Sequence, residues 1–241
     1  MLESKIRTQE EIEQYMTELK TWLKKERNTP IEEMTDFFTN RLAIYENVHL
    51  GHWAKEYAHI ADYFNSELDT LLDIGCGTGL ELEAIYRRFP NASVTGIDLS
   101  KNMLEKLNEK YKNKEIELIL ADYFEYDFGT EKYTAALSFE TLHHFEYQKK
   151  QKIYQKLYRT IKQGGYYIEC DYIACNKEEE DICLEQYHYR RRVNNIPDDV
   201  FVHIDIPLTI EHQIDLMKNA GFKDVRVLYE NCGTMIIRAD K

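Results

Sequence analysis

The stretch LLDIGCGTG, residues 71–79, decides the fold of this 241-residue chain. An apolar run is followed by three glycines at alternate positions, Gly75, Gly77 and Gly79. A strand that ends in a glycine-rich turn brings the backbone close to a bound nucleotide, because glycine has no side chain to hold the two apart. We therefore predict a buried strand that leads into a nucleotide-binding loop.

Short apolar runs continue after this loop and alternate with helical patterns. Following TLLDIG, they are SVTGID, ELILAD, TAALSF and GYYIEC. The helix before the last run carries Ile153, Leu157 and Ile161 on one face and is expected to stop at Gly164-Gly165. Strands that alternate with helices at this spacing predict an α/β fold, a doubly wound and mostly parallel sheet with helices on both faces.

The two ends of the chain depart from this alternation. Residues 1–68 read as an N-terminal helical cap, with helices at 8–27, near 34–42 and near 53–64, and residues 69–241 as the nucleotide-binding domain. Residues 176–208 are rich in charge and lack clear periodicity, so we expect a lid-like insertion there. The chain is expected to end with a helix from Thr209 to Gly221 and a hairpin turning at residues 231–233, which places one antiparallel strand in the sheet.

The composition restricts the partners. Lys and Arg number 31 against 43 Asp and Glu, a net charge of −12, which argues against a nucleic-acid partner. The run Arg190, Arg191 and Arg192 is expected on a solvated helix face. Five scattered cysteines, a charged N-terminus and the lack of a long apolar run predict free thiols, a cytoplasmic location and no membrane partner. A monomer and a homodimer both stay open.

The loop itself indicates which nucleotide it holds. A dinucleotide loop would need GxGxxG, but the position of the third glycine is occupied by Leu80. Asp73, two residues before the first glycine, would oppose a pyrophosphate and suit a cationic ligand. Asp98 and Asp122 end the next two predicted strands, where one carboxylate can accept hydrogen bonds from ribose hydroxyls and the other lies within reach of an adenine amine.

LLDIGCGTG, VTGIDLSKNML, ILADYFEYDF and LSFETLHHF resemble successive motifs of the class I S-adenosylmethionine (SAM)-dependent methyltransferases, from about residue 40 to the C-terminus. The resemblance implies a seven-stranded sheet of order 3-2-1-4-5-7-6 with strand 7 antiparallel. It also implies SAM as cofactor and S-adenosylhomocysteine (SAH) as product. It places Asp98 on the ribose, Asp122 with Tyr123 at the adenine, and Tyr45 over the site. The residues expected to bind the cofactor are Asp73, Gly75, Cys76, Gly77, Asp98, Leu99, Met103, Asp122, Tyr123, Ser138 and Tyr45.

The chemistry of methyl transfer singles out a few further side chains. An amine acceptor mainly needs alignment, whereas a hydroxyl needs a base or a metal ion. His143 and His144, after the fourth strand, and Asp171, at the end of the fifth, are predicted to be catalytic. Two sets could instead hold a divalent metal, although no metal ligand is assigned: Glu140 with His143 and His144, or Asp171 with His203 and Asp205.

The expected activity is therefore methyl transfer to a nitrogen or oxygen atom of a small-molecule acceptor. Three alternatives stay open: a metal-assisted O-methyltransferase, an enzyme that modifies SAM itself, and an RNA methyltransferase. A SAM-modifying enzyme would need basic residues for an extra carboxylate, and the sequence does not locate them. The net charge and the lack of an aromatic, basic surface disfavour RNA.

Overall fold

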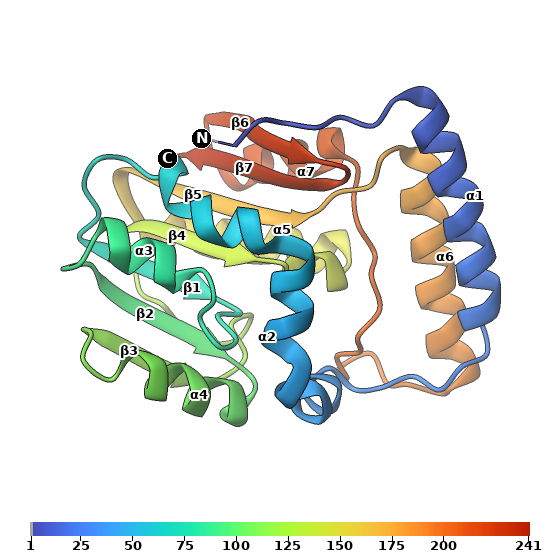
Figure 1. The fold of residues 1–241 in the computed structure, drawn as a ribbon, viewed down its shortest axis with the longest axis horizontal. Helices are drawn as coiled ribbons and strands as arrows, with labels where there is room; N and C mark the ends of the chain where they lie inside the picture. Colours follow the sequence, from blue (N-terminus) through green and yellow to red (C-terminus); the bar gives the residue numbers. More distant parts are fainter. Residues whose placement is uncertain (1) are drawn as a thin grey trace.

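The computed structural model describes residues 2–241 and is built around one seven-stranded sheet (Figure 1). The strand order is β3-β2-β1-β4-β5-β7-β6, and β7 pairs antiparallel with both neighbours, as predicted. The strands are β1 (Thr70–Ile74), β2 (Ser93–Asp98), β3 (Ile116–Leu120), β4 (Tyr133–Phe139), β5 (Ile161–Tyr172), β6 (Asp224–Asn231) and β7 (Thr234–Asp240).

Helices cover both faces of the sheet because successive strand residues point to opposite sides. Leu71 belongs to a core cluster with residues of α3 (Leu82–Arg88), α4 (Lys101–Tyr111) and the end of α2 (Met34–His59). Leu72 belongs to a second cluster with residues of α5 (Tyr147–Thr160) and α7 (Ile210–Ala220). Because β1 to β5 pair in parallel, their carboxyl ends lie at one edge of the sheet, where the predicted acidic residues gather.

The expected stop of α5 at Gly164-Gly165 is wrong. The helix ends at Thr160, and Ile161 is already extended as the first residue of β5. Both glycines lie inside β5, next to an irregular register between β4 and β5. A Cβ atom on Gly165 would lie 3.0 Å from the carbonyl oxygen of Lys162, so this glycine permits close backbone approach and does not end a helix.

The N-terminal region holds two helices where three were expected. The second and third predicted helices form the continuous α2, which bends at Trp53 (φ −123°, ψ 24°) and leads into the short 3₁₀ helix η1 (Ile60–Tyr63). The indole N–H of Trp53 donates to the Thr234 hydroxyl oxygen at 3.0 Å and ties the bend to β7.

Residues 176–208 contain a regular helix that the sequence pattern did not reveal. Helix α6 (Lys177–Val193) packs beside α1 (Gln9–Glu26), apart from the sheet (Figure 1). Its buried positions recur at helical spacing but are mostly polar: Glu179, Glu180, Cys183, Gln186, Tyr187, Arg190 and Arg191. A search for apolar periodicity misses such a helix because its inner face is held by hydrogen bonds, for example from the Gln186 amide to the Leu23 carbonyl oxygen at 3.0 Å.

Local signals at the chain ends are confirmed. Thr8 and Glu11 form a capping box, Thr209 caps α7, and Gly221 ends it with φ 117°. The hairpin turns at Cys232 and Gly233, both with positive φ. All five cysteines are free, and no helix among residues 2–241 is long and apolar enough to cross a bilayer.

Of the three arginines expected on a solvated helix face, only one is exposed, and this difference in burial can be tested. Arg190 and Arg191 are buried, whereas Arg192 is exposed. The Arg190 guanidinium donates to the Thr29 and Pro30 carbonyl oxygens at 3.2 and 3.1 Å. We expect Arg190→Ala to lower the unfolding free energy by about 1–3 kcal/mol, since the buried Arg190 side chain and its hydrogen bonds to Thr29 and Pro30 are lost. In thermal melts, Arg192→Ala should match the parent; equal Tm values for the two variants would contradict the anchoring role.

Glu169 on β5 gives a pH-dependent prediction. It is fully buried and accepts hydrogen bonds from Tyr154 at 2.8 Å and Tyr167 at 2.7 Å. Burial, aided by the charge of Asp171, raises the pKa of Glu169 from 4.5 to about 7. Between these values the folded chain keeps a proton that the unfolded chain has lost, so this group's stabilisation is complete below pH 4.5 and is lost as the pH rises through about 7.

Glu169→Gln should remove that dependence. The fall in unfolding free energy between about pH 4.5 and 8 should shrink by up to about 3 kcal/mol. Urea unfolding at both pH values measures this, with the exposed Glu67→Gln as control. Parallel pH curves for the parent and Glu169→Gln would show that Glu169 titrates normally.

Candidate functional site

The glycine loop after β1 lies at the carboxyl edge of the sheet, as predicted. Gly75, Gly77 and Gly79 all have positive φ, between 48° and 69°. A Cβ atom on Gly75 would lie 2.9 Å from Cβ of Thr141, and one on Gly77 would lie 3.1 Å from the Tyr45 hydroxyl. Only glycine fits such a conformation and such close neighbours.

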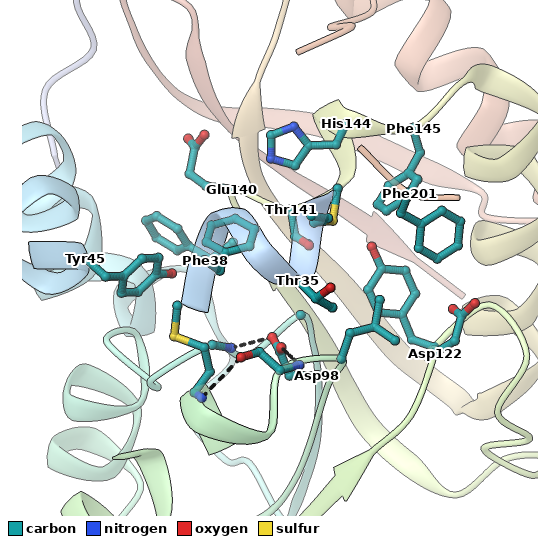
Figure 2. Close-up of a pocket in the computed structure, with 18 residues that line it drawn as sticks. Thr35, Phe38, Tyr45, Asp98, Asp122, Glu140, Thr141, His144, Phe145 and Phe201 are labelled. Atoms are coloured by element: carbon teal, nitrogen blue, oxygen red, sulfur yellow. Dashed lines mark hydrogen bonds between the residues drawn. The ribbon is translucent and has the colours of Figure 1, made fainter. Parts of the chain in front are cut away.

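Asp98, at the end of β2, holds this loop in place. Its Oδ2 accepts the backbone N–H of Gly77 at 3.0 Å, and its Oδ1 accepts that of Ser100 at 2.7 Å (Figure 2). Burial raises the pKa of Asp98, while these N–H donors oppose the rise. Each carboxylate oxygen can accept a further hydrogen bond, and Asp98 lines the cavity beside the loop.

This cavity, called here the glycine-loop cavity, encloses about 630 Å³, part of it open to solvent. The predicted cofactor residues on its wall are Tyr45, Gly75, Gly77, Asp98, Leu99, Met103, Asp122 and Tyr123. Asp122 lies at the far end from Tyr45, and its Oδ1 accepts the backbone N–H of Phe124 at 2.7 Å.

Three residues predicted to bind the cofactor do not line the glycine-loop cavity and lie beneath its surface. Asp73 is 1% exposed under the loop, and Ser138 is fully buried beside the Tyr167 hydroxyl. The Cys76 sulfur lies against Gly96 of β2, 2.9 Å from where a Cβ atom would stand. Burial and the neighbouring carboxyl of Glu81 raise the pKa of Asp73 well above its usual value. The raised pKa of Asp73 weakens the expectation of a bare negative charge beneath the loop.

A second cavity adjoins the first and is rich in histidine. This histidine cavity encloses about 780 Å³, and its wall includes His49, His52, His143, His144 and His203. Both cavities share Phe38, Tyr45, Glu140 and His144 as lining residues. Trp53 and Asp205 also line the second one.

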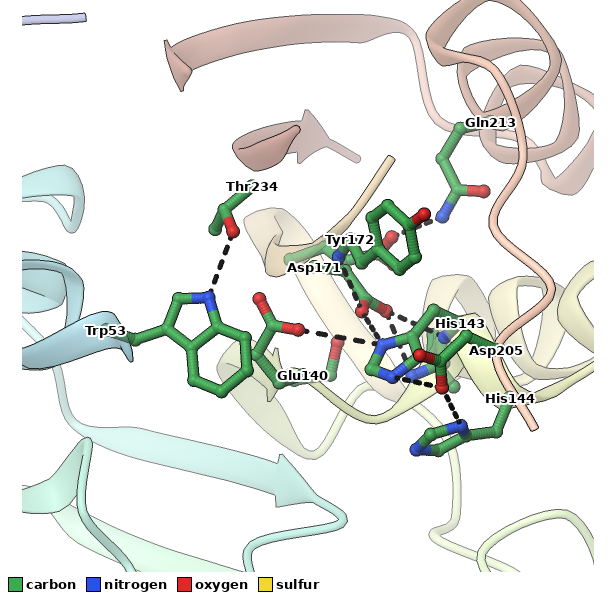
Figure 3. A network of polar contacts seen from close by, with 12 residues as sticks. Trp53, Glu140, His143, His144, Asp171, Tyr172, Asp205, Gln213 and Thr234 are labelled. Carbon is green, nitrogen blue, oxygen red and sulfur yellow. Dashed lines mark hydrogen bonds and ion pairs between the residues drawn. The ribbon is translucent and has the colours of Figure 1, made fainter. Parts of the chain in front are cut away.

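The predicted catalytic residues meet between these cavities (Figure 3). The Nδ1 atom of His143 contacts the Asp171 carboxylate, whose Oδ2 also accepts the backbone N–H groups of Leu142 and His143 at 2.9 and 3.1 Å. Asp205 Oδ1 lies 3.1 Å from His144 Nδ1 and 3.6 Å from His143 Nε2. The two alternative sets from the sequence therefore form one cluster. The His203 ring lies beside His144, with centroids 4.5 Å apart, and stacks on Phe37 at 3.5 Å.

Burial and neighbouring charges shift the pKa values of the groups in this cluster in different directions. Burial opposes a charge on His143, but the carboxylates of Asp171, Asp205 and Glu140 outweigh it and raise the pKa of His143 to about 9. Burial and the charge of His143 lower the pKa of His144. Burial raises the pKa of Glu140 well above its usual range.

Sequence reasoning missed several cavity residues. Phe38 of α2 lines both cavities. Phe201, from the segment after α6, lines the glycine-loop cavity with Phe145, whose ring centroid lies 5.2 Å away. From the N-terminal region only α2 residues line this cavity, while α1 packs on α6. No local motif marks Phe38 or Phe201, because each reaches the cavity only through the folding of distant segments.

Comparison with known proteins identifies the central part of the chain. Residues 71–165 match a family model described as a methyltransferase domain. The chain is 25% identical over 219 residues to the carboxy-S-adenosyl-L-methionine synthase of Nautilia profundicola, with 84% of this chain and 92% of that protein covered. It is 26% identical over 167 residues to the phosphoethanolamine N-methyltransferase of Plasmodium falciparum, covering 69% and 58%.

Among solved structures, human N-acetylserotonin methyltransferase in complex with SAM has a TM-score of 0.61 at 16% identity. The likeness covers 82% of this chain and 55% of the human one, and it concerns the fold alone. The chain thus spans little more than half the length of the Plasmodium and human proteins.

Proposed function

We propose, because the chain belongs to the class I SAM-dependent methyltransferases, that it transfers the methyl group of SAM to a nitrogen or oxygen nucleophile of a small molecule. One observation carries this proposal: the glycine-loop cavity adjoins a second cavity through shared residues, including Glu140 and His144. A cofactor in the first can then present its methyl group to an acceptor in the second.

The residues of the glycine-loop cavity suit SAM. Gly75 and Gly77 leave room beside the loop that a Cβ atom would fill. In the proposed complex, Asp98 accepts hydrogen bonds from the ribose hydroxyls, and Asp122 with Tyr123 flanks the adenine. Tyr45, which faces the loop from α2, closes the site. SAM supplies an activated methyl carbon, whose bond to sulfur breaks as the acceptor's lone pair forms the new bond, leaving SAH.

The chain's task in this reaction is alignment and, for a hydroxyl acceptor, removal of its proton. We assign activation of the acceptor to His143, His144 and Asp171. All three are buried, and His143 contacts both Asp171 and His144. The two histidines line the cavity where the acceptor is placed, and Asp171 lies behind them. The net charge of −12 supports a small molecule over a nucleic acid as the acceptor.

Modification of SAM itself is the second candidate, and the similarity to a carboxy-SAM synthase over 84% of the chain favours it. A carboxylated SAM carries an extra negative charge, which a buried site must pair with a cation. Among the described residues that line the glycine-loop cavity, none is a lysine or an arginine. Arg41 lines the adjoining histidine cavity, toward which the methyl group is directed, so labelled-SAM turnover decides between the two candidates.

The test uses methyl-labelled SAM with amines, phenols and aliphatic alcohols, and in parallel with a small-molecule cell extract. We expect SAH to form and the label to enter a product that passes a dialysis membrane, with no turnover by Asp98→Ala. Label retained on macromolecules would contradict a small acceptor. Consumption of SAM to a carboxylated derivative, seen by mass spectrometry, would favour the second candidate.

A further inference from the structure

Three atoms of metal-ligand type converge between the two cavities. They are Nε2 of His143, Nδ1 of His144 and a carboxylate oxygen of Asp205. The two histidines follow β4, and Asp205 belongs to the segment between α6 and α7. The backbone N–H of Ile206 donates to the His143 carbonyl oxygen at 2.7 Å, so the segments that carry these side chains are fixed to each other.

The spacing of these atoms matches a coordination shell. Asp205 Oδ1 lies 3.1 Å from His144 Nδ1 and 3.6 Å from His143 Nε2. Ligands bound at about 2.0–2.2 Å to one ion stand about 3.0–3.5 Å apart from each other. The three ligand atoms all lie within 4.8 Å of one another, so they can reach one ion after small rotations of the side chains.

His144 provides a second, independent observation. Its side chain is buried, and its Nδ1 has no hydrogen-bond partner among residues 2–241, although Asp205 Oδ1 is 3.1 Å away. The carboxylate thus lies near the nitrogen without the geometry of a hydrogen bond. A buried nitrogen without a hydrogen bond is costly, and a shared cation would satisfy both atoms.

The surroundings of His143 also suit a histidine that binds a metal ion. Its Nδ1 contacts the Asp171 carboxylate, which leaves Nε2 on the side of Asp205. A carboxylate that holds the far nitrogen of an imidazole is the usual support of a histidine that binds metal.

We propose that His143, His144 and Asp205 form a binding site for a divalent first-row transition metal ion. Two imidazoles and one carboxylate suit ions such as Zn²⁺, Co²⁺ or Mn²⁺, and three protein ligands leave positions free for another molecule. His144 and Asp205 both line the histidine cavity, so the free positions adjoin the space assigned to the acceptor. Metal binding itself stands apart from the proposed function; a role in making a hydroxyl acceptor more acidic rests on it.

Metal titration without SAM or acceptor tests the proposal. Metal-free protein lacking any affinity tag is titrated with Co²⁺, followed by its visible absorption and by calorimetry, and Zn²⁺ is then added as competitor. We expect one Co²⁺ per chain, displaced by Zn²⁺. His144→Ala and Asp205→Ala should each weaken binding by more than about 100-fold, because losing a supporting residue alone costs about 10–100-fold.

The controls separate this site from other histidines and from misfolding. His52→Ala removes a histidine of the same cavity outside the triad and should bind Co²⁺ like the parent. Asp205 is 40% exposed at its side chain, so its alanine variant is expected to fold even if the buried His144→Ala does not. Binding unchanged in Asp205→Ala, or less than one ion per chain in the parent, would overturn the proposal. SAH affinity, measured separately, reports on the cofactor site alone.

Discussion

Replacing Asp98 with alanine is expected to lower the affinity for SAH by about 100-fold or more. The carboxylate lines the glycine-loop cavity and also fixes the loop through the N–H groups of Gly77 and Ser100. A hydrogen bond to a charged group contributes about 1.5–3 kcal/mol, and two ribose hydroxyls would lose such a partner together. Each 1.4 kcal/mol corresponds to about tenfold in affinity. Calorimetric titration with SAH measures the change.

Two further variants make this result specific. Asp98→Asn keeps one carbonyl oxygen and the shape of the side chain, so its affinity should lie between those of the parent and Asp98→Ala. Asp127→Ala removes an exposed carboxylate outside the cavity and should leave SAH binding unchanged. If Asp98→Ala binds SAH as tightly as the parent while its melting curve stays cooperative, the ribose does not sit on Asp98.

The residues at the carboxyl ends of the parallel strands could be predicted to meet, because their place in the sequence relative to each strand determines where they lie. A parallel sheet brings the carboxyl ends of its strands to one edge, so Gly75, Asp98 and Asp122 had to approach each other once β1, β2 and β3 were recognised. Each of these strands is short, apolar and followed by a turn. In the structure the loop glycines have positive φ, a conformation that favours glycine.

The contact of Asp205 with His143 and His144 was not predicted from sequence, which placed them in two separate sets. Sixty residues separate them, and their contact depends on how α6 and the chain after it fold back over β4. Helix α6 itself escaped prediction because its buried face is polar, with Glu179 and Arg190 in place of apolar residues. Patterns of hydrophobicity record burial against a core and carry no information about buried hydrogen-bond networks.

Asp171→Asn is expected to lower kcat by about 100-fold while leaving SAH affinity and the KM for SAM nearly unchanged. The Asp171 carboxylate contacts Nδ1 of His143 and accepts the backbone N–H groups of Leu142 and His143. Asparagine can keep these two backbone bonds through its carbonyl oxygen, whereas the bond from the Tyr172 backbone N–H to Oδ1, at 2.9 Å, is lost. Its amide then faces His143 Nδ1 and donates to it, which forces the imidazole proton onto Nε2.

Moving the imidazole proton of His143 from Nδ1 to Nε2 removes both functions proposed for Nε2, metal binding and proton removal from the acceptor. In the parent, His143 has a pKa of about 9, and loss of one proton leaves Nδ1–H on Asp171 and frees Nε2. In the variant the remaining proton stays on Nε2, which can then neither bind a metal ion beside Asp205 nor take a proton from an acceptor, so the loss in kcat follows from both. Steady-state kinetics with the acceptor found by the labelled-SAM test give kcat and KM, and Glu56→Gln provides the control. Glu56 is equally buried and accepts the Tyr229 hydroxyl at 2.7 Å, but it lines neither cavity. Loss of SAH affinity in Asp171→Asn would assign Asp171 to the fold, whereas an unchanged kcat would remove His143 from activation of the acceptor.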